Sequence, residues 1–154
     1  GSIISRFEAV LSQVIILVSY LPLLMGTGGN TGTQAATLII RGLSIDEIDL
    51  KDLGKVLWKE LRISIILGVV LSTVNLAKVV FIDGQPFMVG MTVAVSMIVV
   101  ITFAKLLGGL LPMLAQKVGL DPALMATPMI TSLTDMASAV TYLLIASILL
   151  GIAL

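Results

Sequence analysis

The chain has 154 residues, of which 58% are hydrophobic and only 12% are charged, and nine basic residues balance nine acidic ones. It contains no cysteine and no histidine, which excludes disulfides, thiolate or imidazole zinc sites and histidine proton relays. A metal ion bound within the chain must therefore be held by oxygen, as hard cations such as Mg²⁺ are, and the zero net charge gives no sign of a nucleic-acid partner.

Four long apolar segments are expected to cross a membrane as helices. They are residues 7–26, 63–82, 87–111 and 122–150. About 20 residues at a rise of ~1.5 Å each cross the hydrocarbon core, so every segment is long enough. We therefore predict an all-α integral membrane protein, built as a helical bundle of four long spans.

A polar, glycine-rich stretch, residues 26–34, directly follows the first apolar segment. It predicts a broken helix near membrane depth, where non-helical backbone is tolerated only if it is buried or lines a watery cavity. Broken helices offer carbonyls and helix ends to ions. Neutral side-chain oxygens come from Asn30, Thr31, Thr33 and Gln34. The alternative is a close helix-packing site at Gly28-x-x-x-Gly32, which does not account for Asn30 and Gln34.

The charged connection that follows, residues 41–62, carries leucines on one helical face, together with Trp58. This pattern predicts an amphipathic interfacial helix at the membrane surface, with a solvated helical linker as the alternative. Ser44 with Glu47, and Asp49 with Asp52, are candidate helix starts.

The remaining connections, residues 83–86 and 112–121, are short, and the second ends in Asp121-Pro122, a typical helix start. Lys and Arg are concentrated in the connections 41–62 and 112–121. The positive-inside rule therefore predicts that these two connections face the cytoplasm and that both termini face outward.

Asp135 is the only charged residue between Ala123 and Leu154, and it lies near the middle of the last span among small and hydroxylated neighbours. A carboxylate at this depth costs about 3 kcal/mol on insertion scales, so it is expected to face a bundle interior, a water path or an ion. The alternative is a protonated, purely structural Asp135 that bonds to a neighbouring helix. No arrangement of a nucleophile with a base is present, so an enzyme is not expected.

Residues 22–41, Pro-Leu-Leu-Met-Gly-Thr-Gly-Gly-Asn-Thr-Gly-Thr-Gln-Ala-Ala-Thr-Leu-Ile-Ile-Arg, resemble the signature of the MgtE-type magnesium channels. So do Asp121-Pro122-Ala123-Leu124, Pro128 and Asp135 after Thr131. The resemblance implies a multi-pass protein of a bacterial plasma membrane that forms homodimers with five spans per subunit. It further implies that the Asp135 carboxylates bind hydrated Mg²⁺ on a pathway along the dimer axis.

On this resemblance, residues 1–154 form a single transmembrane ion-conducting domain, a fragment without the first span and without the cytoplasmic N and CBS regulatory domains expected in a full-length protein. Asp135 is the expected metal ligand. The expected pathway-lining residues are Gly28, Gly29, Asn30, Thr31, Gln34, Thr131, Thr134 and Ser138.

The expected function is a magnesium channel, a dimeric pore in membrane lipid. Mg²⁺ is the transported ion, and Co²⁺, Mn²⁺ and Ca²⁺ are further candidates. The alternatives are a secondary carrier that exchanges Mg²⁺ against Na⁺ or H⁺, and a non-transporting assembly subunit.

Overall fold

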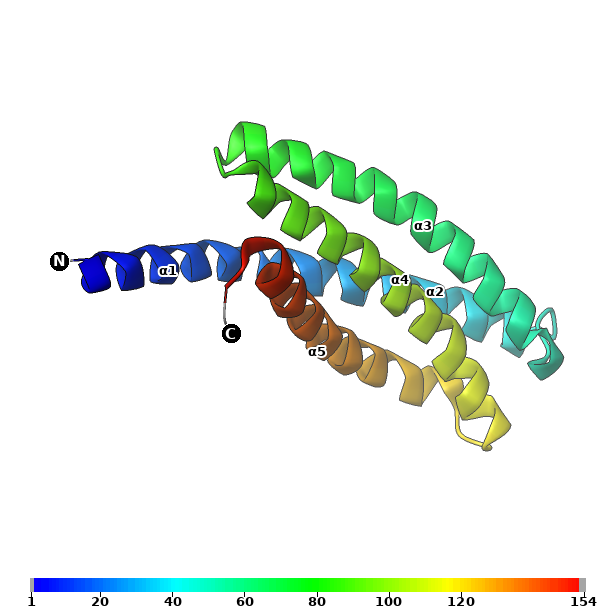
Figure 1. Cartoon of the computed structure of the whole chain (residues 1–154). Coiled ribbons are helices and arrows are strands. Elements are labelled where there is room, and N and C mark those ends of the chain that lie inside the picture. The colour runs from blue at the N-terminus through cyan, green and yellow to red at the C-terminus, as the bar shows by residue number, and fades with distance from the viewer. Residues whose placement is uncertain (1, 153–154) are drawn as a thin grey trace.

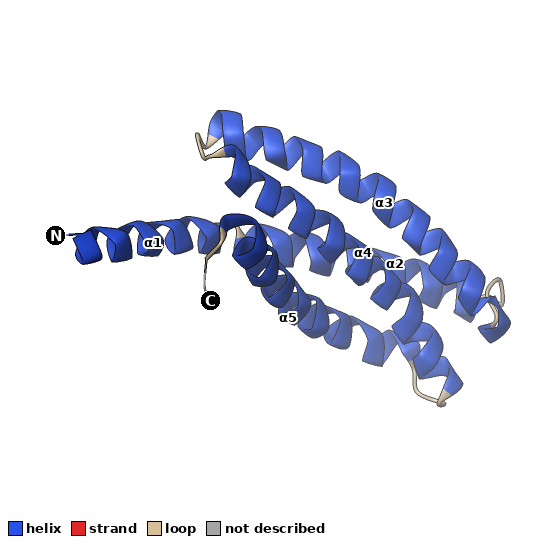
Figure 2. Ribbon diagram, in the orientation of Figure 1, coloured by secondary structure: helices blue, strands red, loops and turns tan. Residues whose placement is uncertain are grey.

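The computed structural model describes residues 2–152, which are helical almost throughout (Figures 1 and 2). The elements are α1 (Ser2–Ser19), α2 (Leu21–Ser44), the 3₁₀ turn η1 (Leu50–Asp52), α3 (Leu53–Ala77), the π-helical turn η2 (Lys78–Ile82), α4 (Phe87–Lys117) and α5 (Pro122–Leu150). Within residues 2–152, four helical stretches are long and apolar enough to cross a membrane: Ser2–Ser44, Leu50–Ile82, Phe87–Lys117 and Pro122–Leu150. The prediction of an all-α membrane fold with four long spans is confirmed.

Helix α4 is the centre of the bundle and packs against α2, α3 and α5. In α4, 56% of the most apolar 18-residue stretch is buried. In the corresponding stretches of the other three spans, at most 22% is buried. Because lipid is as apolar as leucine, helices in a membrane associate through close van der Waals packing rather than through a hydrophobic driving force. Helix α1, by contrast, extends beyond the bundle and is exposed along most of its length.

The predicted break in the glycine-rich stretch is wrong, because α2 is helical from Leu21 to Ser44. The chain instead bends at Tyr20, between α1 and α2, just before Pro22. Proline lacks an N–H group and its ring clashes with the carbonyl four residues earlier, so it favours the first turn of a helix. The predicted first span, residues 7–26, therefore crosses this joint.

Two glycines of the stretch, Gly28 and Gly32, are buried where α2 meets α4 and α5. A Cβ atom on Gly28 would lie 2.8 Å from Cγ1 of Val100, and one on Gly32 would lie 2.8 Å from Cγ2 of Ile130. These separations are shorter than a van der Waals contact, so the absence of side chains is what lets the helices approach. The packing interpretation of Gly28-x-x-x-Gly32 therefore holds in the structure.

The predicted interfacial helix is not a separate element, because α3 runs without interruption from the charged connection into the apolar span. No proline or glycine lies between Lys55 and Leu67 to end the helix. Likewise, α4 continues through Pro112 to Lys117, so the connection predicted at residues 112–121 shrinks to four residues. Pro112 is tolerated because neighbouring helices can satisfy the backbone groups that a proline frees within a membrane.

The helix starts were predicted with mixed success. The predicted start at Asp49 and Asp52 is present as a capping box of η1. The Oδ1 atom of Asp121 accepts a 2.9 Å hydrogen bond from the N–H of Ala123 at the start of α5. The predicted helix start at Ser44 and Glu47 is wrong: Ser44 is the last residue of α2, and its hydroxyl donates to the carbonyl of Arg41.

The connections 45–52 and 118–121 lie at the same end of the bundle, whereas the loop 83–86 and the end of α5 lie at the other (Figure 1). We call the first end the basic end, because it carries Arg41, Lys51, Lys55, Lys59, Arg62 and Lys117. This arrangement agrees with the predicted orientation, which stays a prediction.

Candidate functional site

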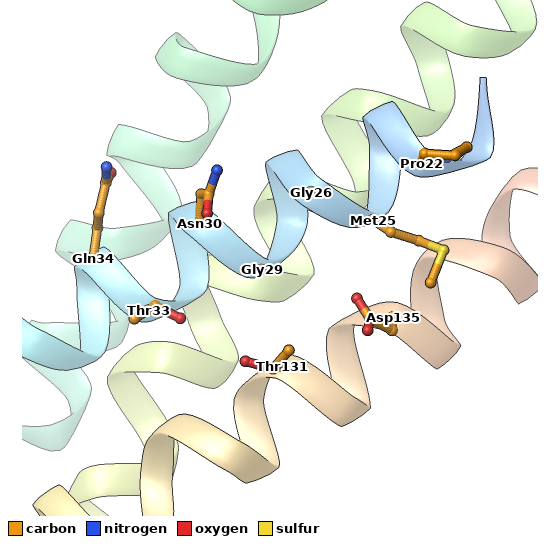
Figure 3. A pocket seen from close by; sticks show the side chains of 9 residues that line it. All are labelled: Pro22, Met25, Gly26, Gly29, Asn30, Thr33, Gln34, Thr131 and Asp135. Carbon is orange, nitrogen blue, oxygen red and sulfur yellow. The ribbon is translucent and has the colours of Figure 1, made fainter. Parts of the chain in front are cut away.

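A groove of about 640 Å³ runs between α2 and α5 (Figure 3). Its lining residues are Pro22, Met25, Gly26, Gly29, Asn30, Thr33, Gln34, Thr131 and Asp135. The α2 residues recur at spacings of three and four, so they share one helix face, and the two α5 residues are one turn apart. Continuous helices therefore build this groove, and no broken backbone is needed.

Among the described residues that line the groove, Asp135 is the only ionisable one. Its side chain extends from α5 towards α2 (Figure 3). The two ion pairs of residues 2–152 join Lys78 to Asp83 and Lys105 to Glu60, so neither neutralises Asp135. A carboxylate without a countercharge at this depth is an attractive position for a cation.

Two glycines of α2, Gly26 and Gly29, line the groove together with this carboxylate. A Cβ atom on Gly26 or Gly29 would meet nothing within 4 Å, so open space lies in front of the bare backbone. The Thr131 hydroxyl donates a 3.1 Å hydrogen bond to the carbonyl of Thr127, which leaves oxygen lone pairs available on Thr131. Asn30 and Gln34 lie at the edge of this α2 face, and their side chains extend away from Asp135 (Figure 3).

The groove unites five of the predicted residues: Gly29, Asn30, Gln34, Thr131 and Asp135. The other four, Gly28, Thr31, Thr134 and Ser138, are buried between the helices of the chain and do not line the groove. The hydroxyls of the three residues other than Gly28 form hydrogen bonds within their own helices. Thr31 donates to Thr27 at 2.8 Å, Thr134 to Ile130 at 2.7 Å and Ser138 to Thr134 at 2.6 Å, each time to a backbone carbonyl.

Pro22, Met25, Gly26 and Thr33 also line the groove but were not in the predicted set. Pro22, Gly26, Gly29 and Thr33 follow one another at spacings of four, three and four, which is the signature of a single helix face. Treating the glycine-rich stretch as a broken segment hid this pattern.

The groove contains one carboxylate, and residues 2–152 contain no group of three or more acidic side chains close enough to hold a metal ion. The groove of one chain therefore offers a divalent cation a single charged ligand, Asp135. It can attract such an ion electrostatically and exchange hydrogen bonds with water molecules that the ion keeps.

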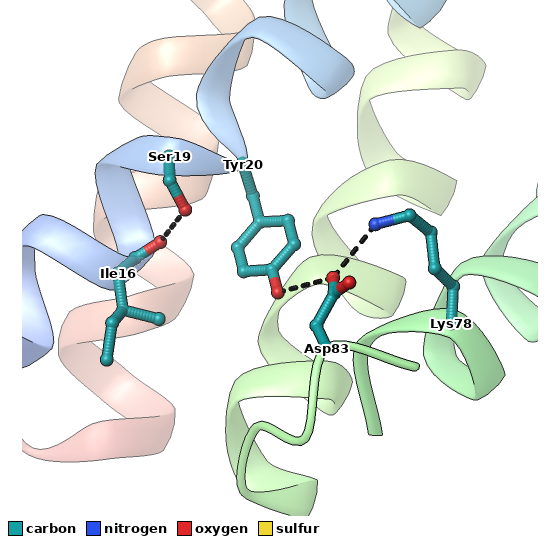
Figure 4. A network of polar contacts seen from close by, with 5 residues as sticks. All are labelled: Ile16, Ser19, Tyr20, Lys78 and Asp83. Atoms are coloured by element: carbon teal, nitrogen blue, oxygen red, sulfur yellow. Dashed lines mark hydrogen bonds and ion pairs between the residues drawn. The ribbon is translucent and has the colours of Figure 1, made fainter. Parts of the chain in front are cut away.

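A polar network ties the joint between α1 and α2 to the loop after η2, at the end of the bundle opposite the basic end (Figure 4). The Oδ2 atom of Asp83 accepts hydrogen bonds of 2.8 Å from both the Tyr20 hydroxyl and the Lys78 ammonium. These two donors, Lys78 foremost, hold the pKa of the Asp83 carboxyl below its ordinary value.

Known proteins similar to this chain extend the resemblance over most of its length. The family model MgtE, described as "Divalent cation transporter", matches residues 21–145. The chain is 43% identical over 150 residues to "Magnesium transporter MgtE" of Thermus thermophilus, covering 97% of this chain and 33% of that protein. It is 38% identical over 147 residues to the protein of the same name from Bacillus subtilis, covering 96% of this chain and 32% of that protein. The chain thus spans about a third of the length of these relatives.

Proposed function

The chain belongs to the MgtE family of divalent cation transporters, and we propose that it moves hydrated Mg²⁺ across the membrane through a passive pore at the axis of a homodimer. The observation that carries this proposal is the Asp135 carboxylate, which lies without a countercharge in a groove walled by glycine backbone and hydroxyl oxygens. The relatives named as magnesium transporters supply the identity of the ion.

The size of the groove suits an ion that keeps its water. Mg²⁺ prefers an octahedral shell, dehydrates reluctantly and is commonly held through one or two carboxylates. Six water molecules at ~30 Å³ each occupy roughly 180 Å³, well below the groove volume of about 640 Å³. A dehydrated ion would instead need several more protein oxygens around it than Asp135 and Thr131 provide.

The double positive charge of Mg²⁺ favours a dimer of the chain over a monomer. One Asp135 leaves a dication with one uncompensated positive charge, whereas a two-fold axis along the groove would bring two Asp135 side chains to the same ion. Two-fold dimers are the commonest closed oligomers. In the proposed pore, the α2 and α5 faces of both chains enclose the ion, and Asp135 attracts it without stripping its inner waters. Weak, water-mediated contacts of this kind let an ion leave as well as enter.

The test is a flux measurement on liposomes that contain only this chain and a trapped Mg²⁺-sensitive dye. We expect Mg²⁺ influx that follows the imposed concentration gradient and membrane potential, and that needs no counter-gradient of Na⁺ or H⁺. Influx no faster than in protein-free liposomes would refute the proposal. A strict dependence on a counter-ion gradient would replace the pore with an exchange carrier.

A further inference from the structure

A second cavity, which we call the basic pocket, lies at the basic end between the end of α2, the connection 45–52 and the first turns of α3. Its volume is about 620 Å³. It is lined by Leu38, Ile39, Arg41, Gly42, Glu47, Ile48, Asp52, Lys55, Val56, Lys59, Glu60, Ile63 and Lys105. None of these residues belongs to the groove around Asp135, so the basic pocket has no part in the proposed ion pathway.

The charges in the basic pocket divide into a buried pair and an unpaired rim. Lys105 and Glu60 are both buried, with Nζ 3.6 Å from Oε2, and they compensate each other at the base. Arg41, Lys55 and Lys59 are exposed, and none of them takes part in either ion pair of residues 2–152. The rim therefore presents three cationic side chains that the rest of the described chain leaves without an ionic partner.

Two carboxylates share this rim with the three cations. Asp52 is already engaged as a helix cap, since its Oδ2 accepts a 3.0 Å hydrogen bond from the N–H of Asp49. Glu47 is exposed and makes no ion pair of its own within residues 2–152. The rim therefore has three cationic and two acidic side chains. Its net positive charge favours the binding of an anion.

The surroundings place the basic pocket at the level of lipid headgroups. Trp58 is 58% exposed, and the guanidinium of Arg62 lies 5.7 Å from the centroid of its ring. Tryptophan side chains gather at the border between headgroups and hydrocarbon. Long basic side chains near the ends of spans extend to the same level. Trp58 lies on α3 between Lys55 and Ile63, so the cationic rim and this border coincide along the helix.

The pocket also has an apolar side. Leu38 and Ile63 line it, and their side chains are 62% and 37% exposed. The same cavity therefore presents cationic side chains at its rim and exposed aliphatic surface beside them. A free phosphate ion could use only the first of these features, whereas a phospholipid could use both.

We propose that the basic pocket binds one anionic phospholipid, with its phosphate among Arg41, Lys55 and Lys59 and the start of an acyl chain along Leu38 and Ile63. Pockets of this kind between transmembrane helices commonly hold anionic headgroups. The site is independent of Asp135 and of the proposed ion transport.

The test compares retention of phosphatidylglycerol with that of phosphatidylcholine, by native mass spectrometry of the protein released from mixed micelles. The double variant Arg41→Gln/Lys59→Gln removes two rim charges. The double variant Lys51→Gln/Lys117→Gln is the matched control, because it removes two exposed charges at the same end that do not line the basic pocket. Unchanged melting in detergent micelles that contain phosphatidylcholine would show that both variants fold.

We expect the parent to retain phosphatidylglycerol in preference to phosphatidylcholine. The apparent affinity should fall about tenfold in the rim variant and less than twofold in the control. Equal losses in both variants would mean that general electrostatic attraction explains the binding, and this would overturn the proposal. So would displacement of the lipid by soluble glycerol phosphate at matched concentration, because that result would identify a phosphate site without a lipid component.

Discussion

The Tyr20 hydroxyl lies 2.8 Å from Oδ2 of Asp83, 63 residues further along the chain. The contact joins the bend between α1 and α2 to the loop that connects η2 with α4. The ammonium of Lys78 completes the arrangement, since it lies 2.8 Å from the same oxygen and 5.9 Å from the centroid of the Tyr20 ring. The bend precedes the groove residues of α2, so this contact helps to set where the groove begins.

The Asp83 network predicts a specific loss of stability in acid. Lys78 and Tyr20 hold the pKa of Asp83 below its ordinary value, so the stabilisation is complete above the unfolded-state value of about 3.9 and is lost as the pH falls through the folded-state pKa. Asp83→Asn should lower the melting temperature at pH 7 and show a smaller further drop between pH 5 and pH 3 than the parent does. Melting curves of both proteins across this range measure the difference, and parallel acid losses would contradict the assignment.

Asp135→Asn should abolish Mg²⁺ flux while leaving the fold intact. The change is nearly isosteric, and removing a charge from the middle of a span eases insertion by up to about 3 kcal/mol. The neutral amide no longer offsets the charge of the ion. Glu8→Gln, on the exposed surface of α1, is the control and should conduct like the parent. Liposome flux at equal protein density decides, and full conduction by Asp135→Asn would make Asp135 a structural residue.

Two glycines three residues apart should respond in opposite ways to alanine. Gly32→Ala forces a methyl group against Ile130 and the Ala104 carbonyl, and overpacking of this kind costs about 1–3 kcal/mol. Gly29→Ala meets nothing within 4 Å and gains helix propensity, so the fold should be at least as stable as the parent. Its methyl group enters the groove, however, and should reduce Mg²⁺ flux. Melting and flux measured on both variants test this, and normal flux in Gly29→Ala would argue against transport along the groove.

Millimolar Mg²⁺ should raise the melting temperature by more than NaCl of equal ionic strength does. An ion that binds only the folded protein stabilises it by about 2.7 kcal/mol at a hundredfold excess over Kd. The same comparison in Asp135→Asn shows whether Mg²⁺ binds in the groove or at other acidic surfaces. If it binds in the groove, Mg²⁺ should raise the melting temperature of this variant no more than NaCl does. If the two salts shift the parent equally, screening accounts for the effect.

The buried pair of Glu60 and Lys105 should show strong coupling in a double-mutant cycle. Removing one partner of a buried pair leaves an uncompensated charge and costs about 3–5 kcal/mol. Both side chains are less than a tenth exposed, so Lys105→Met should be strongly destabilising. Adding Glu60→Leu should recover much of the loss, because the remaining charge is then gone. Denaturation midpoints of the two single variants and the double variant measure the coupling. If the loss in the double variant equals the sum of the two single losses, the residues are not coupled.

The positions of the spans could be predicted well because apolar length is a direct physical requirement of the bilayer. The last span matches from Pro122 to Leu150, since Asp121 and Pro122 mark its start unambiguously. The glycine-rich stretch was mispredicted because glycine weakens a helix by only about 1 kcal/mol, whereas backbone groups left without partners in lipid cost several kcal/mol each. Inside a membrane the second effect dominates, and α2 stays helical.

The expected site residues were placed only partly by the sequence. Residue type and depth singled out Asp135, the resemblance to the MgtE-type channels added Thr131, and the structure brings both into the groove. Thr134 is adjacent to Asp135 in sequence, yet it faces the bundle interior, because consecutive residues of a helix are turned about 100° apart. Which side of α5 faces α4 depends on the complementary surfaces of several helices, and no single span records that information.

The walls of the groove come from α2 and α5, yet both rest on α4, which contributes no residue to the lining. The carbonyl of Ala104 would lie 3.1 Å from a Cβ atom on Gly32, so the backbone of α4 limits how far α2 can move inward. The width of the groove is therefore governed by a helix that does not line it. For the proposed transport along this groove, a search for residues that alter Mg²⁺ flux must include positions on α4, because the spacing between the walls is determined behind them.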